Sequence, residues 1–224
     1  MSPSSRLDVY NTILSVGLVP LFYHDDLEVA RQVARASVQG GSRILEFTNR
    51  GPNAMRVFIG LRDFINQEKL PLILGVGSVV DAPTAALYIA HGAEFVVSPI
   101  FNPEVTRLCN RRKIGCIPGC ATASEISQAE ELGAEIVKIF PGESVGGPDF
   151  VKALMGPMPW TRILPTGGVE ATQESLQRWF KAGAAAVGMG SNLVRKEWLQ
   201  KSDYNAIQNT IAQVLAWIQE ARGK

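Results

Sequence analysis

Cysteine and histidine are scarce in this chain of 224 residues. It contains three cysteines, Cys109, Cys116 and Cys120, and two histidines, His24 and His91. A small, odd set of cysteines provides no disulfide framework, which favours a reducing, cytoplasmic location. A zinc site needs about four closely spaced cysteine or histidine ligands. We therefore expect no bound metal, and we expect the three thiols to fill space in the core.

An excess of charge and a long apolar run are also missing. Lys plus Arg is 22 and Asp plus Glu is 21, which leaves a formal net charge of +1. Broad nucleic-acid binding needs a basic surface, so no nucleic-acid partner is expected. No stretch approaches the roughly 20 apolar residues of a membrane helix, and residues 1–8 do not resemble a signal peptide. These absences predict a soluble protein with no membrane partner, in which a local anion site remains possible.

The chain does contain a regular alternation of short apolar runs with helical patterns. The runs cover residues 18–23, 44–48, 72–76, 95–98, 115–118, 136–140, 162–165 and 185–188. Continuous apolar runs of this length are typical of parallel strands covered on both faces. Eight such strand–helix units predict an α/β fold, a closed (β/α)8 TIM barrel. The alternative is an open doubly wound sheet, but the Gly-rich loop that normally follows its first strand is absent here.

Helix signals support the same repeat. The spacing of apolar residues predicts helices over residues 25–38 and 172–182, with Asp81 and Thr122 placed as N-caps of two others. Glycines that suit a left-handed helix end follow four of the helices: they are Gly40-Gly41, Gly92, Gly133 and Gly183. Two further helices lie outside the repeat. The helix at residues 8–16 is placed to plug the barrel floor, and the helix at 204–220 to close the outer ring. Residues 1–224 are expected to form a single domain.

Two polar residues inside apolar runs carry the strongest chemical signal. Lys138 lies in Ile136-Val137-Lys138-Ile139-Phe140, and Glu46 lies in Leu45-Glu46-Phe47-Thr48. A lysine is almost never fully buried without a partner, and burial lowers its pKa. A neutral amine is a nucleophile that forms a Schiff base with a ketone. Glu46 is then a candidate for pairing with Lys138 or for general acid–base work.

Further candidates follow the strands, where such barrels build their sites. Arg50 comes just after the second run, and its planar fork suits a carboxylate or phosphate. Ser78 ends Gly75-Val76-Gly77-Ser78, after the third run. Two Gly-rich turns, Thr166-Gly167-Gly168 and Gly190-Ser191, follow the last two runs. Backbone N–H groups in such turns form a phosphate cradle without lysines. His24 follows the first run and is a candidate substrate contact.

Taken together, these segments resemble a known family. The chain resembles the 2-dehydro-3-deoxy-6-phosphogluconate (KDPG) aldolases, often described together with 4-hydroxy-2-oxoglutarate (KHG) aldolase, over about residues 17–194. The matching segments, in order, are Val19-Pro20, Gly40-Gly41, Leu45-Glu46-Phe47-Thr48, Arg50, Gly75-Val76-Gly77-Ser78, Ser98-Pro99, Pro118-Gly119, Lys138-Ile139-Phe140-Pro141, Gly146-Gly147, Lys152-Ala153-Leu154, Gly156-Pro157, Pro165-Thr166-Gly167-Gly168 and Gly190-Ser191.

The resemblance implies a class I, Schiff-base aldolase on a (β/α)8 barrel, commonly a homotrimer, with no metal or other cofactor. It implies that Lys138 forms the Schiff base and that Glu46 moves protons. It also implies substrate binding for nine residues: Arg50, Ser78, Pro99, Phe140, Thr166, Gly167, Gly168, Gly190 and Ser191. The expected reaction is cleavage of KDPG to pyruvate and glyceraldehyde 3-phosphate, with cleavage of KHG to pyruvate and glyoxylate as a second activity.

Three alternatives remain open at this point. The first is an aldolase for 2-dehydro-3-deoxy-6-phosphogalactonate. The second is a phosphate-binding barrel isomerase or epimerase, in which Glu46 abstracts a proton and Lys138 has no covalent role. The third is a non-catalytic protein that binds a sugar phosphate. Some members of the family place an arginine after the first strand, where this chain has Phe22-Tyr23-His24, so the preferred aldehyde also stays open.

Overall fold

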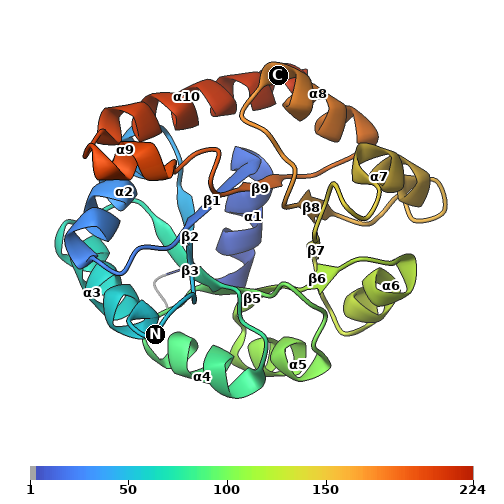
Figure 1. Cartoon of the computed structure of the whole chain (residues 1–224). Coiled ribbons are helices and arrows are strands. Elements are labelled where there is room, and N and C mark those ends of the chain that lie inside the picture. Colours follow the sequence, from blue (N-terminus) through green and yellow to red (C-terminus); the bar gives the residue numbers. More distant parts are fainter. Residues whose placement is uncertain (1–3, 224) are drawn as a thin grey trace.

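A ring of helices surrounds a curled parallel sheet in the computed structural model, which describes residues 4–223 (Figure 1). The strands are β1 (Leu18–Phe22), β2 (Ile44–Thr48), β3 (Ile73–Gly77), β4 (Phe95–Val97), β5 (Gly115–Ile117), β6 (Gly119–Cys120), β7 (Val137–Ile139), β8 (Ile163–Pro165) and β9 (Val187–Met189). The helices are α1 (Arg6–Val16), α2 (Leu27–Gln39), α3 (Ala54–Gln67), α4 (Ala82–Ala90), α5 (Pro103–Arg112), α6 (Ala123–Glu131), α7 (Gly147–Met155), α8 (Gln173–Ala182), α9 (Lys196–Gln200) and α10 (Tyr204–Ala221). The predicted alternation of strands and helices is therefore present, and the short helix α9 was not predicted.

The strands form two parallel sheets. The first has the order β5-β4-β3-β2-β1-β9, and the second has the order β6-β7-β8. The expectation of one continuous, closed barrel is corrected at two places. Pro118, which has no N–H to donate, separates β5 from β6 in the predicted fifth strand. On the other side, β8 and β9 are joined only through the isolated bridges Ile163–Ala184 and Thr166–Gly188. The fold shown is thus a curled, barrel-like α/β arrangement.

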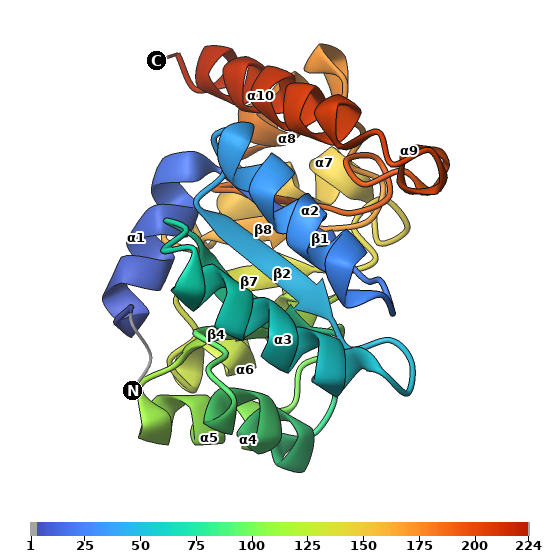
Figure 2. The ribbon, with the colours of Figure 1, turned by 90° about the vertical axis from the view of Figure 1, so that its left-hand side faces the viewer.

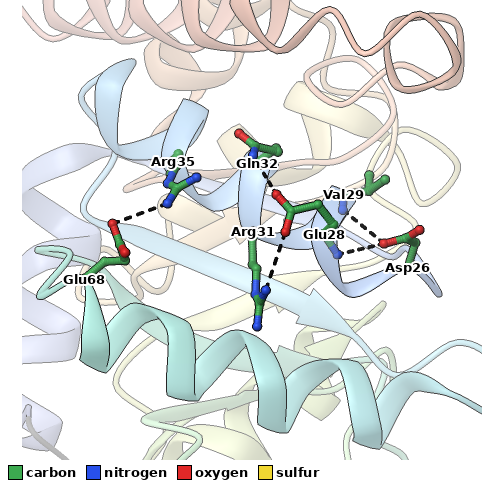
Figure 3. Close-up of polar contacts among 7 residues, drawn as sticks. All are labelled: Asp26, Glu28, Val29, Arg31, Gln32, Arg35 and Glu68. Carbon is green, nitrogen blue, oxygen red and sulfur yellow. Dashed lines mark hydrogen bonds and ion pairs between the residues drawn. The ribbon is translucent and has the colours of Figure 1, made fainter.

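Local signals set the ends of the helices. Asp26 caps α2, because its carboxylate accepts hydrogen bonds from the backbone N–H groups of Glu28 at 2.7 Å and Val29 at 3.3 Å (Figure 3). Asp81 caps α4, and Thr122 caps α6, as predicted. Four of the helix-ending glycines have a positive φ: Gly41 (97°), Gly92 (92°), Gly133 (85°) and Gly183 (112°). These caps keep each helix short enough for the chain to return to the sheet.

Helix α1 closes the end of the sheet at which the strands begin. Its side chains Val9 and Ile13 are fully buried in a cluster with inward-facing strand residues. The hydroxyl of Tyr10 accepts from the N–H of Cys116 at 2.9 Å and donates to its carbonyl at 3.3 Å. The prediction that this helix plugs the floor is confirmed. Figure 2 shows α1 and α9 at opposite ends of the molecule, so the open end is the one near α9.

Helix α10 packs against both α2 and α8 and so completes the outer ring, as predicted (Figure 1). The guanidinium of Arg222, just beyond it, donates to the carbonyls of Leu14 at 3.0 Å and Ser15 at 3.1 Å. It also donates to the carbonyl of Ala185. These bonds tie the last helix to α1. Among the described residues, no helix is long and apolar enough to cross a membrane.

Candidate active site

Strands β2 and β7 carry the two buried polar side chains that the sequence singled out. Glu46 is 3% exposed and Lys138 is 5% exposed. Glu46 lies in register with Leu21 of β1 and Gly75 of β3. Lys138 lies in register with Leu164 of β8. Because side chains alternate along a strand, Glu46 shares the inner face with Ile44, which belongs to the interior cluster.

Burial changes the ionisation of both groups. Burial lowers the pKa of Lys138, the negative charge of Glu46 opposes this shift, and the positive charge of Arg50 adds to it. Burial also raises the pKa of Glu46, against the pull of Lys138 and Arg50. In the part of the chain that the structure describes, no hydrogen bond or ion pair joins Glu46 to Lys138. An amine held in this way is biased toward its neutral, nucleophilic form.

The glycine at the end of β3 makes room for the Glu46 carboxylate. A Cβ atom placed on Gly77 would lie 1.6 Å from Oε1 of Glu46. No side chain is tolerated at that distance, so the glycine is required for a carboxylate in this position. The motif Gly75-Val76-Gly77-Ser78 thus has a structural explanation beyond a plain turn.

A cavity of about 400 Å³ opens at the carboxyl ends of the strands. Six of the predicted site residues line it: Arg50, Phe140, Thr166, Gly167, Gly190 and Ser191. The Nζ atom of Lys138 lies 4.9 Å from the centre of the Phe140 ring, which connects the buried amine to the cavity wall. Thr166 presents a buried hydroxyl oxygen that has no hydrogen-bond partner in the described structure. The cavity wall therefore includes a cation, a threonine with an unpartnered hydroxyl, and an aromatic ring that contacts the buried amine.

The lining of this cavity does not include Lys138 or Glu46, nor three of the nine predicted substrate-binding residues. Ser78 is half-buried and adopts a left-handed backbone, with φ of 57°. Pro99 is also half-buried. It lies against Gly119, because a Cβ atom added to Gly119 would be 2.4 Å from the carbonyl carbon of Pro99. Gly119 is in turn the register partner of Lys138. Gly168 lines a separate cavity of about 270 Å³ beside α8. The structure thus places Pro99 beside the lysine strand and turns Gly168 away from the main cavity.

His24 lies one step away from the main cavity. Its Nδ1 atom accepts a hydrogen bond from the N–H of Asp26 at 3.0 Å and lies 3.6 Å from a carboxylate oxygen of Asp25. It lines an adjoining cavity. Across residues 4–223, no group of three or more histidine, cysteine, aspartate or glutamate side chains is arranged to hold a metal ion.

Sequence reasoning missed several residues of the cavity wall. They include Tyr23, Thr48 and Leu199. The sequence could have indicated Thr48, because alternation along the strand places it on the inner face of β2 with Glu46. It gives weaker support for Tyr23, which directly follows β1. It gives none for Leu199, because that residue belongs to α9, whose five residues give too short a pattern to detect.

Comparison with known proteins gives a consistent result. The family described as KDPG and KHG aldolase matches residues 9–210 of this chain. A 2-dehydro-3-deoxy-phosphogluconate aldolase of Treponema pallidum is 37% identical over 163 residues, which cover 73% of this chain and 76% of that protein. A KHG/KDPG aldolase of Escherichia coli is 32% identical over 197 residues, which cover 88% of this chain and 90% of that protein.

A solved structure supports the same relationship. The KDPG aldolase of Legionella pneumophila, with pyruvate captured as a covalent carbinolamine intermediate, superimposes with a TM-score of 0.83 at 27% identity. The match covers 91% of this chain and 96% of that chain. The galactonate, isomerase and binding-protein alternatives are not favoured by these relatives.

Proposed function

This chain belongs to the KDPG and KHG aldolase family, and we propose that it is a Schiff-base aldolase that cleaves KDPG to pyruvate and glyceraldehyde 3-phosphate. Cleavage of KHG to pyruvate and glyoxylate is a second activity under the same proposal. The reaction is that of a carbon–carbon lyase and uses no metal. Lys138 and Glu46 are its catalytic residues.

In the first half of the reaction, the neutral amine of Lys138 attacks the C2 ketone of the substrate. Loss of water gives an iminium, which accepts an electron pair. Glu46 removes the proton from the C4 hydroxyl, the C3–C4 bond breaks, and glyceraldehyde 3-phosphate leaves. The electron pair of that bond forms an enamine. Protonation at C3 and addition of water then release pyruvate and restore the amine of Lys138.

The remaining site residues bind the anionic ends of the substrate under this proposal. Arg50 supplies a cation at the cavity wall. The turns at Gly167 and at Gly190-Ser191 supply backbone N–H groups for phosphate. The unpartnered hydroxyl of Thr166 is available to donate to a substrate oxygen. Ser78, Pro99 and Gly168 are assigned to substrate binding by the resemblance alone.

The observation that carries the proposal is the state of the buried pair. Lys138 and Glu46 are both more than nine-tenths buried on facing strands, yet they make no direct bond to each other among the described contacts. A purely structural pair is expected to close into a hydrogen-bonded salt bridge. A buried pair without a direct bond, whose lysine contacts the Phe140 wall of the cavity, is suited to a substrate that reacts with the amine.

The test is to trap the imine. The protein is incubated with pyruvate and borohydride, its intact mass is measured, and the modified peptide is mapped. A stable pyruvate-sized adduct on Lys138 supports the Schiff-base mechanism. Absence of an adduct in folded protein, with a known class I aldolase trapped in parallel, would remove it.

The proposal also concerns the assembly. We infer a single domain, a homotrimer and a cytoplasmic location. The bonds from Arg222 to α1 support a single domain. The exposed apolar side chains Val80, Leu87 and Ile100 support an oligomer, and three free buried cysteines support a reducing compartment. Sedimentation should give three times the chain mass of 24.3 kDa, and a monomer would refute the trimer.

A further inference from the structure

A second cavity, of about 470 Å³, adjoins the main cavity, which Arg50 and Phe140 line. Four residues line both cavities, namely Tyr23, Ser191, Val194 and Leu199. The second cavity therefore begins where the phosphate-type turn at Gly190-Ser191 ends. Ligand sites in proteins have volumes of roughly 300–1,000 Å³, so each cavity by itself falls within the range of a small-molecule site.

The acidic and basic side chains that line the two cavities are all basic. Arg50 lines the first cavity, while Lys196 and His24 line the second. Among the described lining residues of both, there is no aspartate or glutamate; the cavity beside Gly168, in contrast, is lined by three glutamates. Asp25 lies 3.6 Å from His24, but it is exposed and does not line the second cavity. An anion in the second cavity would thus meet a lysine without a competing carboxylate in the wall.

Lys196 is free to bind such an anion. It is exposed at the start of α9, and within residues 4–223 it has no ion pair or side-chain hydrogen bond. Its neighbours are engaged: the guanidinium of Arg195 lies 3.6 Å from Glu197 and stacks on the Trp198 ring at 4.7 Å. The cation that remains available beside the shared wall is therefore Lys196.

We propose that the two cavities form one extended site, which accepts an aldehyde of four or more carbons ending in an anionic group, with Lys196 binding that terminal anion. The inference rests on the proposed aldolase function and names a further substrate class for the same site. The carbon chain passes between Tyr23 and Ser191. Lys196 acts as a specificity-determining residue and takes no part in the bond-making steps.

The reaction that uses this extension is the reverse, carbon–carbon bond-forming direction. Pyruvate forms the iminium on Lys138, and loss of one C3 proton to Glu46 gives the enamine. The enamine carbon attacks the aldehyde carbon, a new C–C bond forms, and the aldehyde oxygen takes the proton. Hydrolysis of the iminium then releases a 2-keto-3-deoxy acid and free lysine. No oxidant, reductant or other reactant is needed.

The experiment measures kcat/KM for condensation of pyruvate with four aldehydes. Erythrose 4-phosphate is the four-carbon phosphate, erythrose is its neutral counterpart, and succinic semialdehyde has a terminal carboxylate instead. Glyceraldehyde 3-phosphate is the shorter phosphate. Each is tested with the native protein and with Lys196→Met and Lys201→Met. Lys201 is the matched control, because it is an exposed lysine at the other end of α9 that lines neither cavity.

Lys196→Met should lower kcat/KM for erythrose 4-phosphate by about tenfold, the size of one partly solvated charge contact. The loss should appear in KM, with erythrose unchanged and glyceraldehyde 3-phosphate changed by less than about threefold. Loss for succinic semialdehyde as well would define the ligand as any terminal anion, and no loss would restrict it to phosphate. Equal losses in Lys196→Met and Lys201→Met, or equal losses for erythrose and its phosphate, would overturn the proposal.

The same experiment separates this inference from the proposed function. Condensation with glyceraldehyde 3-phosphate and trapping of the pyruvate imine test the aldolase itself. If both succeed while erythrose 4-phosphate is not used, the extended site is refuted and the aldolase stands. If neither succeeds, the proposed function fails and the extended site fails with it.

Discussion

Two buried acid–base pairs in this chain have opposite arrangements. In the first, the guanidinium of Arg62 lies 2.5 Å from the carboxylate of Glu94, and both side chains are less than a tenth exposed. Glu94 also accepts from the N–H of Leu74 at 3.0 Å, and Arg62 donates to Asn66 at 2.7 Å. In the second, Glu46 and Lys138 are equally buried, but the described structure gives them no direct bond.

The difference separates a structural pair from a reactive one. A buried charge is tolerated when a partner and further hydrogen bonds replace its hydration. Arg62 and Glu94 have those partners. Lys138 and Glu46 do not, so burial moves each pKa toward the neutral form. The exposed pair Arg35–Glu68, at 3.3 Å on the outer face of α2 and α3, is a third case, in which solvent screening removes most of the interaction (Figure 3).

The largest effect is expected from Lys138→Met. Turnover of KDPG should fall below detection, because no other group supplies the Schiff-base nitrogen. The thermal midpoint should be unchanged or raised, since a similar-sized apolar side chain replaces a buried amine. Steady-state kinetics measures the turnover of the variant, and thermal unfolding measures its midpoint. Lys152→Met, at an exposed position about one turn before the end of α7, is the control that should keep both properties. Near-normal activity of Lys138→Met would refute the mechanism.

The second-largest loss of activity is expected from Glu46→Gln. The amide keeps the shape of the side chain and removes its ability to accept a proton, so kcat should fall by roughly 10²–10⁴. Imine trapping with pyruvate should still succeed, because Lys138 remains. A variant that loses trapping and turnover together would instead assign Glu46 to placing the amine.

Arg62→Met tests the structural pair. It leaves Glu94 buried without its partner, which should cost about 3–5 kcal/mol of unfolding free energy. The activity of the fraction that stays folded should be unchanged. Arg162→Met, which breaks the exposed pair with Glu135 at 3.0 Å, is the matched control and should cost less than about 1 kcal/mol. Urea unfolding measures the unfolding free energy of both variants. Equal losses of unfolding free energy would contradict the expected difference between buried and exposed pairs.

The smallest effect is a pH dependence of stability. The pKa of Lys138 in the folded protein lies below its ordinary value of 10.5, so the unfolded chain binds more protons between the two values. Unfolding free energy should therefore rise with pH in this window, by at most about 1.4 kcal/mol per unit for one proton. Relative to Lys138→Met, the native protein should gain stability as pH is raised toward 10.5. Urea unfolding of both proteins at a series of pH values checks this, and parallel curves would contradict the burial of a neutral amine.

Much of the site was predictable because it depends on local patterns. Lys138 and Glu46 stand out as polar residues in apolar runs, and helix caps at Asp81 and Thr122 follow from side-chain chemistry next to orphan N–H groups. The break at Pro118 was not predicted, because it depends on which neighbour would have accepted a hydrogen bond. Gly167 and Gly168 were predicted to act in one turn, but Gly167 lines the main cavity and Gly168 lines a separate one beside α8.

Sequence patterns alone predict the order of strands and helices, the buried lysine and glutamate, and the family to which the chain belongs. These follow from periodicity and from residue types at set spacings, which the chain carries locally. Three features depended on the tertiary structure: the absence of a direct bond between Glu46 and Lys138 among the described contacts, the shared wall of the two cavities at Tyr23 and Ser191, and the position of Lys196 beside that wall. Residues far apart in the chain meet there, and their separation depends on how strands curl and helices pack, which no local pattern encodes.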